Sequence, residues 1–169
     1  MKNKGFSLVE LIIVIAIMAI MIGIMVPQLI TYIGKTRVSY DIQICDNISR
    51  AIDATIIEYT AKPENDADTD KIIADLQSGK PIKLSSYGDK SLFAKEVIID
   101  VGISCFDNNA SKYFKSKIAK ANGEIYVQIY EGLTYVWINN SDSSGKDKTI
   151  NTCTDASKLE WGVIASDYP

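Results

Sequence analysis

The chain has 169 residues, of which 47% are hydrophobic, and its 21 acidic and 18 basic residues give a net charge of −3. An acidic chain has no general electrostatic attraction to DNA or anionic lipid, so composition argues against a protein that binds either by overall charge. The absence of histidine removes the commonest general base and the usual zinc ligand. Since no glycine-rich phosphate loop or nucleophile–base pattern stands out either, the sequence predicts no enzyme, no cofactor and no metal site.

The first distinctive segment is an apolar run from Phe6 to Val26. Only Ser7, Glu10 and Gly23 within it are neither large apolar residues nor alanine. As a helix this run is about 30 Å long, which matches the hydrocarbon thickness of a bilayer. The run therefore predicts a single membrane span.

The flanks of the run bear on its orientation and processing. Lys2 and Lys4 precede it and favour a cytoplasmic N-terminus, although Lys35 and Arg37 on the far side weaken this preference. The far side also lacks the small-residue cleavage site of an ordinary secretory signal. An uncleaved anchor is the simplest interpretation, but it leaves Glu10 unexplained, because a charge in hydrocarbon is costly unless it is paired.

The segment from Lys4 to Glu10, K-G-F-S-L-V-E, resembles the processing site of type IV prepilins and pseudopilins. In that family a membrane-embedded prepilin peptidase cuts after the glycine on the cytoplasmic side and N-methylates the new terminal residue. The resemblance implies cleavage between Gly5 and Phe6, methylation of Phe6 and retention of the apolar helix. Its specific motif covers the N-terminal fifth of the chain, and the remainder matches only in general layout.

The resemblance also implies a role for Glu10. In pilus fibres this side chain is thought to meet the charged N-terminal amine of a neighbouring subunit, here that of Phe6, and so to set the register of assembly. Opposite charges in a low dielectric attract strongly, and each offsets the desolvation of the other only when they are paired. The alternative is a Glu10 that snorkels or is protonated in the bilayer.

Gly23 and Pro27 predict a perturbation of the apolar helix. Pro27 removes a backbone donor and clashes with the preceding turn, while Gly23 lowers helix propensity nearby. Family members also carry a helix-perturbing proline at this place. Either the helix kinks or melts around residues 20–28, or Pro27 only marks where the helix leaves the membrane, and the sequence leaves both open.

The helical pattern continues beyond the apolar run. Apolar residues recur at spacings of three and four and form one stripe: Val38, Ile42, Cys45, Ile48, Ile52, Ile56 and Tyr59. Charged residues lie mostly off that stripe: Arg37, Asp41, Asp46, Arg50, Asp53 and Glu58. Because Pro63 and a polar stretch end the pattern, we predict one long helix from Ser7 to Ala61.

The predicted domain organisation follows from this helix. Residues 1–5 are a leader, 6–26 a transmembrane and assembly helix, and 27–62 its amphipathic continuation. Residues 63–169 form a globular β-sheet domain, with residues 38–61 as its helical spine. The predicted fold class is α+β, with an antiparallel sheet packed on the long helix, which is also the pilin architecture.

The clearest element of the globular domain is a β-hairpin. Residues 124–130 and 133–139 are rich in β-branched and aromatic side chains and flank the turn Glu131-Gly132. A further strand is expected at residues 159–164, short helices at 70–77 and 109–121, and a surface loop at 139–149. Residues 92–103 fit either a buried strand or a helix.

Asp66, Asp68 and Asp70 alternate as in a calcium-binding loop. Lys71, however, occupies the place where such a loop needs glycine, and Gln77 that of its bidentate glutamate. An acidic loop that caps the following helix is therefore the better interpretation.

Three cysteines lie on the side of the chain that we expect to be exported, where disulfides form. Cys45 lies on the helical stripe and is expected to be a small buried core residue. Cys105 and Cys153 are then the expected disulfide, which would tie the C-terminal segment to the domain as in many pilins.

Together these observations predict a subunit of a type IV pilus-like filament. Its expected partners are other pilin subunits, the prepilin peptidase, an assembly platform and its ATPase, and the cytoplasmic membrane, which it spans once before assembly into a cell-surface filament. No direct nucleic-acid binding is expected. The alternatives are a pseudopilin of a type II secretion or competence system, and a permanently anchored adhesin or receptor.

Overall fold

The computed structural model describes residues 7–62, 64–120, 123–141 and 147–151 of the chain. The longest element is helix α1, Leu8–Ala61, which begins one residue later than predicted and ends where predicted. The described residues fall into two compact units, residues 7–36 and residues 37–151, and both contain part of α1. The sequence therefore correctly predicted one long helix.

The first unit consists of the N-terminal part of α1. Ser7 precedes the first helical turn, and the backbone is helical from Leu8 onward, including at Gly23 and Pro27. Among the described residues this helix is the one segment long and apolar enough to cross a membrane. The large apolar side chains of residues 8–33 are all exposed within the structure.

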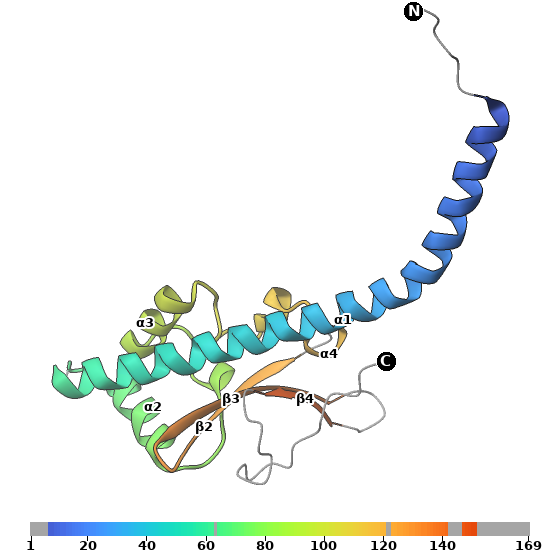
Figure 1. Ribbon diagram of the computed structural model, residues 1–169. Helices are drawn as coiled ribbons and strands as arrows, with labels where there is room; N and C mark the ends of the chain where they lie inside the picture. The colour runs from blue at the N-terminus through green and yellow to red at the C-terminus, as the bar shows by residue number, and fades with distance from the viewer. Residues whose placement is uncertain (1–6, 63, 121–122, 142–146, 152–169) are drawn as a thin grey trace, which may run out of the picture. The chain divides into compact units, whose positions relative to one another are not determined.

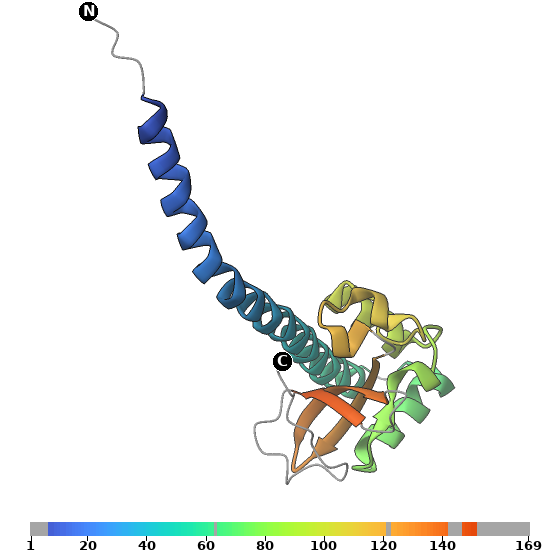
Figure 2. The same cartoon turned by 90° about the vertical axis from the view of Figure 1, so that its right-hand side faces the viewer.

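The second unit has an α+β fold. Residues 37–61 of α1 lie along one face of an antiparallel sheet (Figures 1 and 2). The other elements follow in chain order: α2 (Ala67–Gln77), β1 (Ile82–Lys83), η1 (Leu84–Ser86), α3 (Leu92–Val101), η2 (Ala110–Tyr113), α4 (Lys117–Lys120), β2 (Glu124–Tyr130), β3 (Leu133–Ser141) and β4 (Asp147–Asn151). The strands are ordered β1-β2-β3-β4, and each neighbouring pair is antiparallel.

The β2–β3 hairpin confirms the sequence prediction. Its two-residue turn has positive φ at both positions, 52° at Glu131 and 78° at Gly132. This is the turn geometry that matches the twist of paired strands, and a glycine at the second position adopts it without strain. The register pairs Ile125 with Ile138, so that these buried side chains point to the same face of the sheet.

The core of the second unit lies between α1 and this face of the sheet. The buried residues of α1 are Val38, Asp41, Ile44, Cys45, Ile48, Ala51, Ile52 and Thr55. Ile125 and Val127 of β2 and Val136 and Ile138 of β3 lie at alternate positions and share one face of the sheet, while Gln128 and Trp137 are also buried. Phe93 and Phe106 complete the core in an edge-to-face pair with ring centroids 6.3 Å apart. The predicted stripe was therefore largely right, although Ile42, Ile56 and Tyr59 are only partly buried.

In three connecting regions the structure either corrects the sequence prediction or selects one of two predicted alternatives. Residues 92–103, which fitted a strand or a helix, form α3, with Ser91 as N-cap and Gly102 as a left-handed C-cap at φ 75°. The predicted helix at 109–121 is wrong in its continuity, because η2 ends at Tyr113 and α4 begins at Lys117. The predicted loop at 139–149 is wrong at both ends, because Ser141 and Asp147 pair as the outermost residues of β3 and β4. The expected strand at 159–164 lies outside the described residues.

Asp66 precedes α2 and caps it, as predicted, whereas Asp68 and Asp70 lie within the first turn of that helix. The carboxylate of Asp66 accepts hydrogen bonds from the Asp68 amide at 3.3 Å and from the Thr69 hydroxyl at 2.6 Å. It also accepts one from the Leu92 amide at 2.8 Å, which links α2 to the start of α3. The Thr69 hydroxyl and the Leu92 amide lower the pKa of the Asp66 carboxyl.

Candidate assembly site

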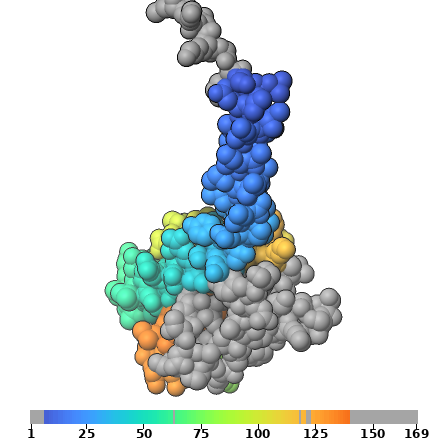
Figure 3. All heavy atoms as spheres, turned by 45° about the vertical axis from the view of Figure 1, so that its right-hand side comes forward, coloured from blue at the N-terminus to red at the C-terminus, as the bar shows by residue number. Residues whose placement is uncertain are grey.

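The apolar surface of residues 8–33 is the dominant feature of the first unit. Exposed fractions range from 40% at Ile33 to 73% at Leu8, and they are high on every side of the helix. Figure 3 shows the side chains of this segment in blue. Each buried CH₂ group contributes about 0.8 kcal/mol on transfer out of water, so this helix needs lipid or other apolar helices around it.

Glu10 occupies the third position of the helix, and Ser7 is its N-cap. One carboxylate oxygen of Glu10 accepts a hydrogen bond from the Ser7 backbone amide at 2.8 Å. The spacing S-x-x-E is that of a capping box, in which the glutamate satisfies an amide that the helix itself leaves unpaired. The Glu10 carboxylate therefore caps the N-terminus of its own helix.

This capping bond adds to the predicted role of Glu10. The amine that cleavage after Gly5 would create belongs to Phe6, the residue next to Ser7 in the chain. Gly5 and Phe6 lie outside the described residues, so cleavage and methylation there stay predictions. An intermolecular partner for Glu10 would have to compete with, or add to, the bond from Ser7.

Gly23 and Pro27 are the two ends of one missing helical hydrogen bond. An amide at position 27 would donate to the carbonyl of residue 23, and proline has no amide hydrogen. In the next turn, the hydroxyl of Thr31 donates to the carbonyl of Pro27 at 3.3 Å, a type of back-bonding that favours bending. No side chain lies within 4 Å of the space that a Cβ on Gly23 would occupy. The described helix is continuous here, and the kink stays a prediction.

The cysteines that the structure describes are both buried. Cys45 is completely buried on α1, in agreement with the prediction of a core residue, and Cys105 is 1% exposed. Burial raises the pKa of the Cys105 thiol to about 12 and also raises that of Cys45. Cys153 lies outside the described residues, so the Cys105–Cys153 disulfide stays a prediction.

Asp41 is a buried polar residue that sequence reasoning placed off the stripe, and that placement was wrong. Its side chain is fully buried, and its two carboxylate oxygens accept hydrogen bonds from the backbone amides of Lys115 at 2.8 Å and Ser116 at 2.9 Å. These two bonds hold the segment between η2 and α4 against α1. Because Asp41 lies three residues after Val38 and four before Cys45, helical spacing alone is the signal that would have placed it among the buried residues.

Comparison with known proteins agrees with these features. Residues 1–26 match the family described as the prokaryotic N-terminal methylation motif. A stretch of 70 residues is 32% identical to the type IV major fimbrial protein FimA of Dichelobacter nodosus and covers 41% of this chain and 44% of that protein. The match therefore spans less than half the length of the relative. No solved structure is detectably similar to the chain.

Proposed function

We propose that this chain, which belongs to the type IV pilin family, is a structural subunit of a cell-surface filament. The observation that carries the proposal is the helix of residues 8–33, whose apolar side chains are exposed on every side. A bilayer can cover this surface while the subunit is stored. Packing against the same helix in neighbouring subunits would cover it equally well in a filament, by close van der Waals contact.

In the proposed maturation, the prepilin peptidase hydrolyses the Gly5–Phe6 peptide bond. The leader with Lys2 and Lys4 is released, and the freed amine of Phe6 is methylated. Losing these two lysines leaves the Phe6 amine as the positive charge at the start of the mature chain, where it is available to pair with a carboxylate. An assembly platform and its ATPase then move the subunit from the bilayer into the filament.

Glu10 pairs with the Phe6 amine of a neighbouring subunit in the proposed filament. Both charges would lie among apolar helices, where each would be costly if it were unpaired. The capping bond from Ser7 supports this role, since it holds the Glu10 carboxylate at the N-terminal end of the helix. The incoming amine would bind this carboxylate in addition to the Ser7 amide, or in its place.

Mass spectrometry of the N-terminal peptide tests the proposal. We expect sheared filaments to contain a chain that begins with N-methylated Phe6. A matched variant, Gly5→Leu, places a bulky side chain at the cleavage position and should leave the full-length chain in the membrane. An intact Met1 chain in every fraction of the wild type, with no filament, would show that the helix is only a tether, as in an anchored surface receptor.

A further inference from the structure

The second unit carries a cluster of exposed basic side chains on α1, η2 and α4. We name it the basic face, and it consists of Arg37, Lys112, Lys115, Lys117 and Lys120. Residues 108–123 contain four of these lysines and no acidic residue. In the part of the chain that the structure describes, no carboxylate lies within ion-pair distance of any of the five, since the ion pair found there joins Lys83 to Glu124.

The basic face is held in place by α1. The Asp41 carboxylate binds the amides of Lys115 and Ser116, and the Lys115 ammonium lies 5.7 Å from the centroid of the Tyr40 ring. Charge-assisted bonds of this kind are about twice as strong as neutral ones, so the backbone that carries the lysines is well anchored. Asp41 offsets one of the five positive charges, so the basic face keeps an excess of positive charge.

An acidic groove lies at the other end of the same unit. It is a hollow of about 450 Å³ between the C-terminal end of α1 and α3. We define the acidic groove by the carboxylates of Glu58, Glu64 and Glu96, among which Lys62 is the one basic lining residue. Leu92, which is 38% exposed, adds an apolar surface beside these charges.

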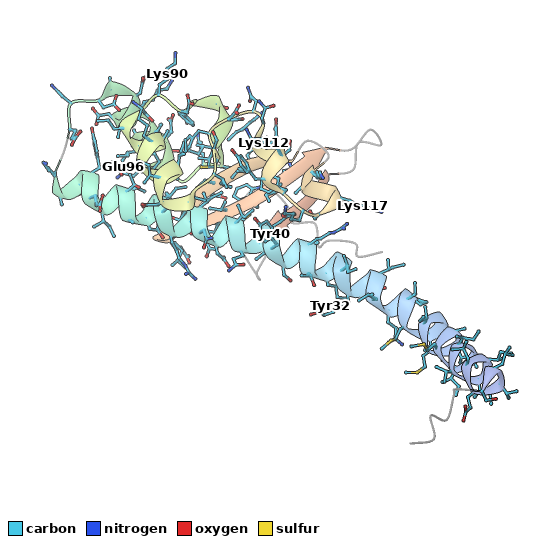
Figure 4. All side chains as sticks on the ribbon, turned by 90° about the horizontal axis from the view of Figure 1, so that it is seen from above. Tyr32, Tyr40, Lys90, Glu96, Lys112 and Lys117 are labelled. Atoms are coloured by element: carbon cyan, nitrogen blue, oxygen red, sulfur yellow. The ribbon has the colours of Figure 1, made fainter. Side chains whose placement is uncertain are left out.

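The two charged surfaces cannot meet within one molecule. Asp41 and Glu58 are seventeen residues apart on one helix, a separation of about 26 Å. Figure 4 shows Lys112, Lys117 and Tyr40 toward one end of the second unit and Glu96 toward the other. In the described part of the chain, the second unit therefore carries an excess of positive charge at the basic face and an excess of negative charge at the acidic groove, where three carboxylates face one lysine.

We infer that the acidic groove of one subunit binds the basic face of a second copy of this chain, an inference that rests on the proposed filament function. Charge complementarity selects the partner, and the two different surfaces make the contact head-to-tail. A head-to-tail contact that does not close into a ring continues as an open helical polymer. The lysine side chains are long enough to enter a hollow of this size, and their alkyl stems can cover Leu92.

Charge reversal on full-length chains tests this contact. Lys112→Glu with Lys117→Glu, and separately Glu58→Lys with Glu96→Lys, should each lower the yield of sheared filaments about tenfold, because at least two ion pairs become repulsive. Combining all four substitutions restores opposite charges across the contact and should return the yield to within about twofold of wild type. The control Lys80→Glu with Lys90→Glu makes the same change in net charge at exposed lysines outside the basic face and should leave the yield unchanged.

The outcomes separate this inference from the proposed function. If wild-type filaments form and the combined variant stays as impaired as either double variant, the contact is absent. If only the basic-face variant is impaired, this surface serves another anionic partner, such as a lipid surface, and the inference fails. If the wild type makes no filament, the proposed function itself fails. Thermal unfolding of each full-length variant in detergent should match that of wild type, because all four positions are exposed.

Cross-linking provides a second measurement that does not depend on yield. A zero-length carbodiimide joins a lysine amine to a carboxylate only when the two are in contact. In filaments assembled from a mixture of isotopically light and heavy subunits, we expect mixed-label peptides that link Lys112 or Lys117 to Glu58 or Glu96. Exclusively same-label links, or none at these residues, would overturn the contact.

Discussion

The two parts of helix α1 differ in how their apolar side chains are removed from water. Ile48 and Ile52, in the second unit, are completely buried against the domain, whereas Ile17 and Ile24, in the first, are 54% and 66% exposed. The second unit therefore obtains its hydrophobic stabilisation from its own chain, while the first depends on lipid or other subunits. Substitutions in one part should change folding, and those in the other should change assembly.

The largest expected effect is at Glu10, where two variants separate charge from capping. Glu10→Ala removes both the carboxylate and the bond to Ser7, whereas Glu10→Gln keeps an oxygen that can cap the helix. Removing one member of a buried ion pair costs about 3–5 kcal/mol, so both variants should reduce filament yield by a factor of 100 or more. Membrane levels of the subunit, measured by immunoblot, should be unchanged. Normal filaments from Glu10→Gln would show that capping, rather than charge, is the function of Glu10.

The effect of a core substitution on folding stability should differ most clearly between the two parts of α1, as Ile48→Ala tests. Because Ile48 is completely buried, its truncation should lower the free energy of unfolding of the second unit by about 2–5 kcal/mol. The matched variant Ile17→Ala removes the same atoms from the exposed part and should leave that unfolding transition unchanged. Denaturant unfolding of both full-length variants in detergent measures this, and equal losses of stability would contradict the comparison.

Asp41 is the one charged residue that is buried in the described part of the second unit, and its removal should destabilise this unit less than Ile48→Ala does. Asp41→Ala leaves the amides of Lys115 and Ser116 without their acceptors. The bond from Lys115 is only partly buried, so water can replace that acceptor, whereas the buried Ser116 amide stays unpaired at a cost of about 1–3 kcal/mol. Asp41→Asn keeps one acceptor oxygen and should cost less than Asp41→Ala. Hydrogen exchange at these two amides should accelerate in both variants, and unchanged exchange would mean that Asp41 does not hold the segment.

The smallest effect concerns the pH dependence of stability in the reduced chain. The pKa of Cys105 is about 12 in the folded state and about 8.5 in an unfolded chain, so the folded state binds more protons between these values. Stability should therefore fall as pH rises above about 8.5, by up to about 1.4 kcal/mol per pH unit from this thiol. Cys105→Ala should remove this part of the slope. An unaltered slope in the variant would contradict a buried Cys105 thiol, and a slope that appears only after reduction would support the disulfide with Cys153.

Several features could be predicted from the sequence because local chemistry decides them. A long uninterrupted apolar run can form only a helix in a membrane, since every backbone polar group must then be satisfied within the segment. The hairpin followed from two β-rich segments around Glu131-Gly132, and the cap at Asp66 from an acidic residue before a helical pattern. The motif around Gly5 and Glu10 likewise lies in a few adjacent residues.

Other features were decided by the tertiary structure. Asp41 is buried because its carboxylate accepts hydrogen bonds from the amides of Lys115 and Ser116, which are 74 and 75 residues away in the chain. Both amides belong to the segment that separates η2 from α4. Residues 92–101 are a helix because Asp66 and Ser91 accept hydrogen bonds from its first amides, whereas their apolar run alone fitted a strand equally well. The acidic groove and the basic face exist only once α3, η2 and α4 are placed against α1. The sequence by itself thus determined the helix and its anchor, while long-range hydrogen bonds and packing decided how the domain distributes its charge.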